Sequence, residues 1–221
     1  MEINVMRDVL GKNDELAEAI KKDFTARRIF VLNMLGSPGS GKTTLLEATL
    51  RALSGEIRTA VIEGDLFTSK DAERIEAYGV PVVQINTSGG CHLDAFMVKK
   101  AIRSLNLDEI DFIVIENVGN LVCPAEFALG EDEKAVVLSV TEGDDKPMKY
   151  PLIFKESAVT ILSKIDLLPF TNFNVNRATE DIKTIHPRAD VIGVSATKGE
   201  GMDAWYGWLR YRIKAKREDR Q

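Results

Sequence analysis

Cysteine and histidine are scarce in this sequence of 221 residues, which contains two of each. Long apolar runs are missing too. No uncharged stretch reaches the roughly 18 residues of a membrane-spanning helix, and the start, MEINVMRDVLGKNDELAEAIKKDF, lacks the apolar centre of a signal peptide. We therefore expect a cytoplasmic protein without a membrane partner. In a reducing cytoplasm, two cysteines favour metal binding, reactivity or simple packing over a disulfide.

A surplus of basic side chains is also absent. The formal net charge is -5, with 29 Lys and Arg against 34 Asp and Glu. Proteins that bind nucleic acid concentrate Lys and Arg on one face, so we do not expect nucleic acid to be the main ligand. The basic stretch RYRIKAKREDR near the C-terminus mixes charges of both signs, which is typical of a solvated helical face.

Short apolar runs alternate with helical patterns, which predicts an α/β fold with a mainly parallel β-sheet flanked by helices on both faces. Strands are expected near residues 28–35, 58–64, 80–85, 111–116, 134–141, 158–163 and 190–195. Helices are expected near residues 42–53, 70–78, 93–105, 147–156, 174–185 and 202–217.

The first 27 residues are expected to form an amphipathic helical appendage, and residues 28–221 the main domain, because the length suits one sizeable core. Apolar side chains recur in the appendage at helical spacing among many charges. They are Leu10, Leu16, Ile20 and Phe24.

The segment GSPGSGKT, residues 36–43, matches the phosphate-binding pattern G-x-x-x-x-G-K-S/T. It follows an expected strand and precedes an expected helix, which is the setting that the pattern requires and which argues against a glycine-rich turn without a ligand. Lys42 is expected to neutralise the β- and γ-phosphates, and the Thr43 hydroxyl to bind Mg²⁺. Backbone N–H groups and the helix start surround phosphate in such loops. The remaining predicted contacts are Gly36, Ser37, Gly39, Ser40, Gly41 and Thr44.

Two later segments predict that the base is guanine. SKID, residues 163–166, follows the sixth expected strand at the place where GTPases hold the NKxD motif. The Asp166 carboxylate can accept the N1–H and the exocyclic amino group of guanine, a donor pair that adenine lacks. Lys164 can cover the ring with its aliphatic stem. Ser163 replaces the usual Asn, which is expected to weaken a contact on the loop side of the base and to leave discrimination by Asp166 intact.

SAT, residues 195–197, follows the seventh expected strand, where GTPases hold the motif SAK. The backbone N–H of Ala196, beside Ser195, can reach guanine O6. Taken alone, SKID fits a solvated strand end better than a base-reading loop. Its position beyond a phosphate loop and ahead of SAT favours GTP as the nucleotide.

The segment ENVGNLVCP, residues 116–124, stands where GTPases sense the γ-phosphate. Glu116 is expected to lie near Mg²⁺, and the Gly119 N–H to meet the γ-phosphate. Asp65 is a second acid for the Mg²⁺ site, with a role in orienting the attacking water; a solvated carboxylate is the alternative for either acid. Asn120 replaces the usual Gln and the loops show no arginine finger, so slow hydrolysis is expected.

Three of the four Cys and His residues fall in two short segments, GGCHLDA and ENVGNLVCP. Both segments follow expected strands at the ligand-binding edge of the sheet, so Cys91, His92 and Cys123 are expected to meet. Thiolates and an imidazole suit Zn²⁺ or Ni²⁺ better than Mg²⁺. Buried free cysteines and a satisfied histidine are the alternative. Three ligands leave room for a fourth donor from water, a transfer partner or a second copy of the chain. The last gives the hypothesis of an exchangeable site at the interface of a homodimer, which we expect to be nucleotide-dependent.

Taken in order, the phosphate loop, GGCHLDA, ENVGNLVCP, LSVTEGDDKPMKYP and SKIDLLPF resemble the HypB family, GTPases that assist nickel insertion into nickel–iron hydrogenases. The resemblance covers the chain from about residue 28 to its end. It implies a dimerising P-loop GTPase metallochaperone, a HypA-like nickel/zinc partner and a hydrogenase large-subunit precursor as recipient. It assigns metal ligands to Cys91, His92 and Cys123 and base contacts to Lys164 and Asp166.

The sequence departs from the family pattern in two places. MEINVMRDVL has neither the N-terminal cysteine motif nor the histidine-rich stretch of many relatives, so no separate nickel store is expected. Ala128 stands where the family generally has Asp.

Three alternative functions compete with this interpretation. A urease-type nickel GTPase usually carries Cys-Pro-His instead of adjacent Cys-His. A small-molecule kinase with structural thiols would favour ATP, against SKID and SAT. A metal-storage protein would have no use for a phosphate loop.

Overall fold

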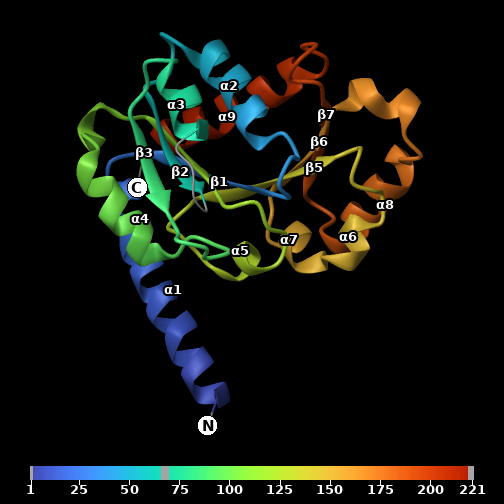
Figure 1. Cartoon of the computed structure of the whole chain (residues 1–221). Helices are drawn as coiled ribbons and strands as arrows, with labels where there is room; N and C mark the ends of the chain where they lie inside the picture. Colours follow the sequence, from blue (N-terminus) through green and yellow to red (C-terminus); the bar gives the residue numbers. More distant parts are fainter. Residues whose placement is uncertain (1, 66–69, 219–221) are drawn as a thin grey trace.

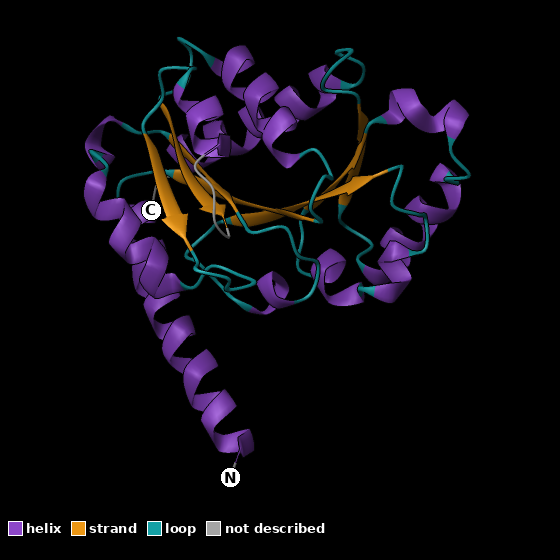
Figure 2. Ribbon diagram, in the orientation of Figure 1, coloured by secondary structure: helices purple, strands orange, loops and turns teal. Residues whose placement is uncertain are grey.

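The computed structural model describes residues 2–65 and 70–218. In this part of the chain seven strands form a single sheet: β1 (Phe30–Gly36), β2 (Thr59–Asp65), β3 (Val82–Asn86), β4 (Phe112–Glu116), β5 (Glu133–Ser139), β6 (Val159–Ser163) and β7 (Asp190–Val194). Every neighbouring pair is parallel, in the order β3-β2-β4-β1-β5-β6-β7 (Figures 1 and 2). The predicted parallel sheet is confirmed, and each strand overlaps its expected range.

Helices cover both faces of the sheet, as predicted (Figure 2). They are α1 (Glu2–Ala26), α2 (Lys42–Leu53), α3 (Lys70–Glu76), α4 (Ala95–Ala101), α5 (Cys123–Glu126), α6 (Lys146–Lys149), α7 (Pro151–Lys155), α8 (Val175–Ile185) and α9 (Met202–Glu218). One core joins α2, α3 and α9 to the sheet and contains the fully buried Trp205. A second core lies beneath α1 and α4, and a third beneath α7 and α8.

Strand β1 is central to this arrangement because its side chains serve both faces. Leu32 and Met34 belong to the core under α2 and α9, whereas Val31 and Leu35 belong to the cores on the other face. This alternation is the period of two that a strand imposes, and burial of all seven residues is typical of a central parallel strand. The loop that follows β1 therefore starts from a fixed point.

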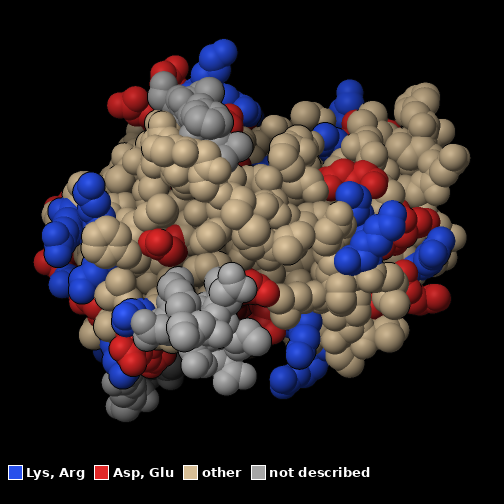
Figure 3. All heavy atoms as spheres, turned by 60° about the horizontal axis from the view of Figure 1, so that its bottom comes forward, with Lys and Arg blue, Asp and Glu red and all other residues tan. Residues whose placement is uncertain are grey.

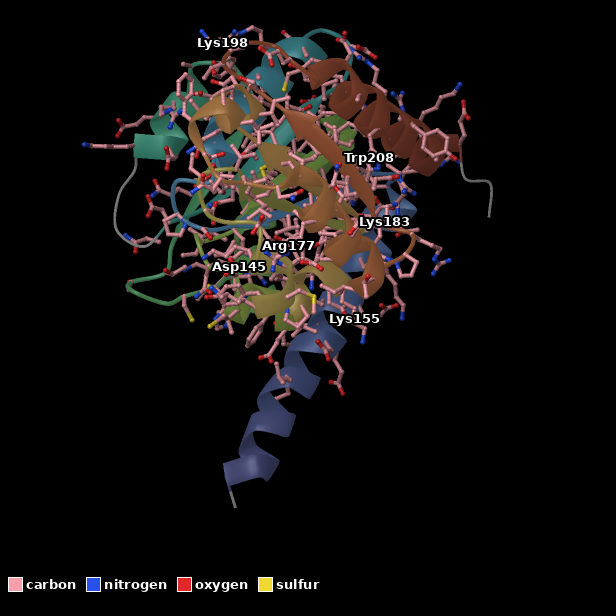
Figure 4. All side chains as sticks on the ribbon, turned by 90° about the vertical axis from the view of Figure 1, so that its right-hand side faces the viewer. Asp145, Lys155, Arg177, Lys183, Lys198 and Trp208 are labelled. Atoms are coloured by element: carbon pink, nitrogen blue, oxygen red, sulfur yellow. The ribbon has the colours of Figure 1, made fainter. Side chains whose placement is uncertain are left out.

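The opposite edge of the sheet is fixed by polar contacts. Trp208 of α9 donates its Nε1–H to Asp190 at the start of β7, at 2.8 Å, and Arg212 lies over the Trp208 ring at 5.2 Å. Lys183 of α8 donates to the Ala189 carbonyl at 2.6 Å. Figure 4 looks onto this edge and labels Trp208 and Lys183. Both helices that flank β7 are thus fastened beside it, and the SAT loop leaves from its far end.

The N-terminal helix is partly integrated into the core. Its C-terminal half buries Ala17, Ile20 and Phe24, and Gly130 comes so close that a Cβ there would lie 2.6 Å from Ile20 Cγ2. The N-terminal half extends away from the sheet (Figure 1). The division into residues 1–27 and 28–221 stays a prediction. None of the described helices is both long and apolar enough to cross a membrane.

Two expected helices differ in extent, and one helix was not expected. Residues 147–156 form two short helices, because Pro151 has no N–H to continue a helix and restricts Tyr150, whose φ is -128°. The helix expected over residues 93–105 begins at Ala95, after the capping residue Asp94, and ends as a 3₁₀ turn. Helix α5 is a single turn between two loops, too short to give a periodic pattern.

Candidate functional site

A cavity of 410 Å³ opens at the carboxyl ends of β1, β2 and β4, where parallel sheets bind their ligands. The phosphate loop forms one wall. Gly39 and Gly41 have φ of 73° and 97°, a left-handed backbone that glycine adopts without strain. A Cβ at Gly36 would lie 2.5 Å from the Val137 carbonyl oxygen. The loop therefore needs glycine at both kinds of position, for conformation and for close packing.

Lys42 is almost fully buried at the base of this cavity. Its ammonium donates to the carbonyls of Gly36 and Ser37, both at 3.3 Å. Backbone carbonyls are weaker partners for an ammonium group than phosphate oxygens are, because they carry no net charge. The side chain is thus held in the loop, close to where phosphate would lie.

Four acidic side chains line the cavity: Asp71 of α3, and three from β2 and β4. Thr43 donates its hydroxyl to the buried Glu116 at 2.8 Å, and Glu63 of β2 lies directly opposite Glu116 of β4 in the parallel register. Asp65 ends β2 and also lines the cavity. The sequence interpretation named Asp65 and Glu116 and missed Glu63, which lies inside a strand and is recognised only from the pairing of β2 with β4.

The Glu63 carboxyl, opposite Glu116, keeps its proton at neutral pH. Burial and the negative charge of Glu116 raise the pKa of Glu63 to about 10, while burial raises the pKa of Glu116 and Lys42 opposes that rise. Two buried carboxyl groups that face each other across paired strands resist ionising together, which is the familiar behaviour of carboxylate pairs. A divalent cation with oxygen ligands would replace that proton.

The loop after β4 lies against the phosphate loop. A Cβ at Gly119 would lie 2.8 Å from the Pro38 nitrogen, and Asn120 forms an isolated bridge with Gly36. Only glycine fits between the two loops at position 119. A movement of either loop must therefore displace the other.

A second cavity of 190 Å³ adjoins the first and shares Gly41, Thr44 and Lys164 with it. SKID and SAT form its other walls, with Asp166, Ser195 and Ala196 among the lining residues. Lys164 has a left-handed φ of 59° and donates to the Gly39 carbonyl at 2.6 Å. A planar base bound here would lie between the two loops, and its phosphates would face the first cavity.

Ser163 contacts the phosphate loop: its hydroxyl donates to the Ser40 carbonyl at 2.5 Å. A hydroxyl thus fastens the base-reading loop to the phosphate loop at the position where related GTPases use Asn. Of the predicted nucleotide contacts, Gly36, Ser37 and Ser40 line neither cavity and shape the loop from behind. The others line one cavity or both.

Cys91, His92 and Cys123 lie together, as predicted. Their ligand atoms are all within 4.8 Å of one another, and Cys91 Sγ is 3.5 Å from His92 Nδ1. Both cysteines are free and half-buried. The His92 ring stacks on Phe127 with centroids 3.9 Å apart, which orients the imidazole. Two thiols and one imidazole at this separation form a donor set of the kind that binds Zn²⁺ or Ni²⁺.

The Cys123 thiol of this cluster is protonated before metal binds, and metal binding displaces its proton. The hydrogen bond with Cys91, followed by burial, raises the pKa of the Cys123 thiol, while burial lowers the pKa of His92. The imidazole is accordingly neutral and ready to bind at neutral pH, whereas the thiol must lose its proton. Metal binding at such a site releases protons and strengthens as pH rises.

Comparison with known proteins agrees with this geometry. The profile of the family "CobW/HypB/UreG, nucleotide-binding domain" matches residues 30–193. The protein named "Hydrogenase maturation factor HypB" from Escherichia coli K12 is 52% identical over 207 residues, which cover 94% of this chain and 71% of that protein. The chain belongs to the HypB family. The resemblance seen in the sequence motifs is confirmed.

Two solved HypB structures share the architecture of the chain. HypB from Helicobacter pylori in complex with nickel superposes with a TM-score of 0.88 at 37% identity, covering 95% of this chain and 99% of that one. HypB from Archaeoglobus fulgidus superposes with a TM-score of 0.86 at 34% identity, covering 92% and 99%. Membership in the HypB family places the chain among P-loop GTPases that bind and hydrolyse nucleotide.

Proposed function

We propose that this chain is a GTP-dependent metallochaperone that supplies nickel for the maturation of nickel–iron hydrogenase in the cytoplasm. The observation that carries the proposal is the continuity of two sites. Only six residues of one segment separate Glu116, at the phosphate cavity, from Cys123, in the cysteine–histidine cluster. The names of the relatives, hydrogenase maturation factors, and the nickel complex of the Helicobacter pylori protein support it.

GTP is the proposed nucleotide because Asp166 lines the smaller cavity, where its carboxylate can accept two guanine donors. Mg²⁺ fits the larger cavity. The second oxygen of Glu116 is buried and receives no hydrogen bond from any described residue, and the Thr43 hydroxyl donates to the first oxygen at 2.8 Å. Hard oxygen donors of this kind suit Mg²⁺, which would neutralise charge on the phosphates. Thr43 and Glu116, with Asp65 nearby, would hold it.

Hydrolysis is proposed to be slow. Arg74 of α3 lines the phosphate cavity, but its guanidinium is engaged by Glu47, at 2.8 and 2.9 Å, and by Asp71, at 2.9 Å. A guanidinium held by two carboxylates is poorly placed to stabilise transition-state charge, and in related enzymes that assistance contributes about 10³–10⁵ in rate. Slow turnover suits a switch that holds one state until its partner is engaged.

Nickel is the proposed cargo of Cys91, His92 and Cys123, and Zn²⁺ is a competing ion with the same ligand preferences. The cluster offers three donors, and a second copy of the chain is proposed to complete the site in the nucleotide-bound dimer. Phe96 and Val122, close to the cluster in sequence, are 69% and 55% exposed. Figure 3 shows the adjoining face, where charged side chains gather at the sides and the middle is largely uncharged. Such a face suits contact with a copy or partner.

The proposed partners are a HypA-like nickel/zinc protein and a hydrogenase large-subunit precursor. A transfer assay tests the whole proposal: the chain is loaded with Ni²⁺, mixed with the precursor and Mg²⁺·GTP, and nickel in the reisolated precursor is measured. We expect GTP-dependent transfer from the wild type and none from Cys123→Ala. Transfer that is equal with and without GTP, or equal for the variant, contradicts the proposal.

A further inference from the structure

The segment that carries Cys91 and His92 is tethered by two buried amide side chains. The Leu93 N–H donates to Asn117 Oδ1 at 3.3 Å, and the Ala95 N–H donates to Asn13 Oδ1 at 2.9 Å. Asn117 directly follows β4, and Asn13 belongs to α1. The position of this segment is therefore set from two different elements of the fold.

The segment that carries Cys123 is tethered by a buried ion pair. Lys134 donates to the Ala125 carbonyl at 3.0 Å and lies 3.6 Å from Glu131. Glu131 in turn accepts the Leu129 N–H at 2.6 Å. Both ends of the chain that follows Cys123 are thus fixed to the start of β5.

Asn33 joins the two sets of tethers. It lies in β1, with no exposed surface, between the apolar neighbours Leu32 and Met34. Its Nδ2 donates to Glu131 at 3.2 Å, and its Oδ1 accepts from Asn117 Nδ2 at 3.3 Å. Burying an amide side chain costs free energy unless its polar atoms are hydrogen-bonded. If this position served folding alone, an apolar residue would suffice in the strand.

The other end of this chain of contacts lies at the nucleotide cavity. Asn117 lines that cavity beside Glu116, and its Oδ1 also accepts the Val118 N–H at 2.9 Å. Gly119, the next residue, packs against Pro38 of the phosphate loop. The Asn117 side chain therefore contacts both the backbone that faces the phosphates and the segment of the cysteine–histidine cluster.

We propose that Asn33 is a positioning residue that couples nucleotide binding to metal binding, an inference that rests on the proposed function. By holding Asn117 Nδ2, Asn33 keeps Oδ1 turned towards Leu93; by holding Glu131, it fixes the segment of Cys123. A shift of Val118 and Gly119 on nucleotide exchange changes the Asn117 contacts and so moves one cysteine segment relative to the other. Metal affinity depends on that separation.

The coupling is measured as a ratio of two dissociation constants for Ni²⁺ alone, one with Mg²⁺·GDP and one with Mg²⁺ and a non-hydrolysable GTP analogue. For the wild type we expect a ratio that differs from one by about 5- to 150-fold. Asn33→Ala is expected to bring the ratio closer to one by about 2- to 30-fold. By reciprocity, the effect of Ni²⁺ on binding of the analogue must shrink by the same factor.

Asn13→Ala is the matched control. Asn13 contacts both cluster segments, through Ala95 and through a bond of 2.9 Å to the Ala128 carbonyl. Among the described residues its hydrogen bonds go to neither β4 nor Asn117. Its loss is expected to weaken Ni²⁺ binding equally in both nucleotide states, which leaves the ratio unchanged. A merely structural role for Asn33 predicts the same behaviour as Asn13.

Asn33→Ser, which keeps a polar group in the strand, serves if Asn33→Ala does not fold, as judged by thermal unfolding. A wild-type ratio retained by the folded Asn33 variant overturns the role of Asn33 and leaves the proposed function standing. A wild type that binds no Ni²⁺, or binds it equally in both nucleotide states, overturns the proposed function and the coupling with it. A reduced ratio for Asn33 variants alone supports the proposal.

Discussion

The phosphate cavity and the cysteine–histidine cluster are built in different ways, although one segment joins them. The phosphate loop is a contiguous stretch of eight residues, with left-handed glycines and a buried Lys42 that is already in place. The cluster brings together residues 32 apart in sequence, held by side chains from α1, β1 and β5. The first is formed within one local segment, and the second depends on the relative position of two segments. A switch is expected to act on the second.

The largest expected effect breaks the nucleotide side alone. Two lysines are among the residues that line the phosphate cavity, and Lys42→Ala removes the one at its base while Lys164 remains. GTP hydrolysis is expected to fall at least about 100-fold. Ni²⁺ binding without nucleotide should stay as in the wild type. Lys155→Ala, on the exposed part of α7, is the control and should change neither quantity. Parallel loss of nickel binding in Lys42→Ala would show that the two regions are not separable.

The complementary change breaks the cluster alone. Loss of a group that only orients a metal ligand weakens metal binding by roughly 10- to 100-fold. Cys91→Ala or Cys123→Ala removes a ligand itself, so each is expected to weaken Ni²⁺ binding by more than that. Equilibrium dialysis measures the affinity, and GTP hydrolysis with Mg²⁺ but without Ni²⁺ should be unaffected. His186→Ala is the control, since His186 instead contacts the Ser157 carbonyl at 3.0 Å. Full nickel binding by both cysteine variants would refute the cluster as the site.

A third change sharpens the identity of the nucleotide. Asp166→Asn removes an acceptor for two guanine donors, and such a pair contributes about 1–3 kcal/mol of discrimination between bases. GTP affinity is expected to fall by about 10- to 100-fold, with preference passing to xanthosine triphosphate, measured by competition with a fluorescent nucleotide. Unchanged GTP binding, or equal affinity for ATP, would favour the kinase interpretation.

The smallest expected effect concerns the proton on Glu63. The pKa of Glu63 is raised to about 10 in the folded protein, so its contribution to stability is complete below pH 4.5 and is lost as pH rises towards 10. Mg²⁺ binding expels that proton, and Mg²⁺·nucleotide affinity should rise by at most about tenfold per pH unit above neutrality. Glu63→Gln should flatten this dependence, measured by calorimetry in buffers of different ionisation enthalpy. An unchanged slope would separate Glu63 from the cation site.

The sequence predicts the contiguous parts of the molecule better than the assembled parts. The phosphate loop and the sheet follow from local patterns, and the scarcity of cysteine and histidine points to Cys91, His92 and Cys123. Glu63 was missed because its importance depends on the register of β2 against β4. Asn33 gives no local signal: only the fold shows that it joins Asn117 to Glu131. The break at Pro151 could have been predicted from the missing N–H.

The measurement that tests the central claim most directly is the mass and metal content of the full chain in solution. The chain is equilibrated with Ni²⁺ and Mg²⁺, with GDP or with a non-hydrolysable GTP analogue, and analysed by size-exclusion chromatography with light scattering and elemental analysis. Nucleotide gating predicts dimers with the analogue, monomers with GDP, and a nickel content per chain that differs between the two. A metal-free monomer in both states would contradict it.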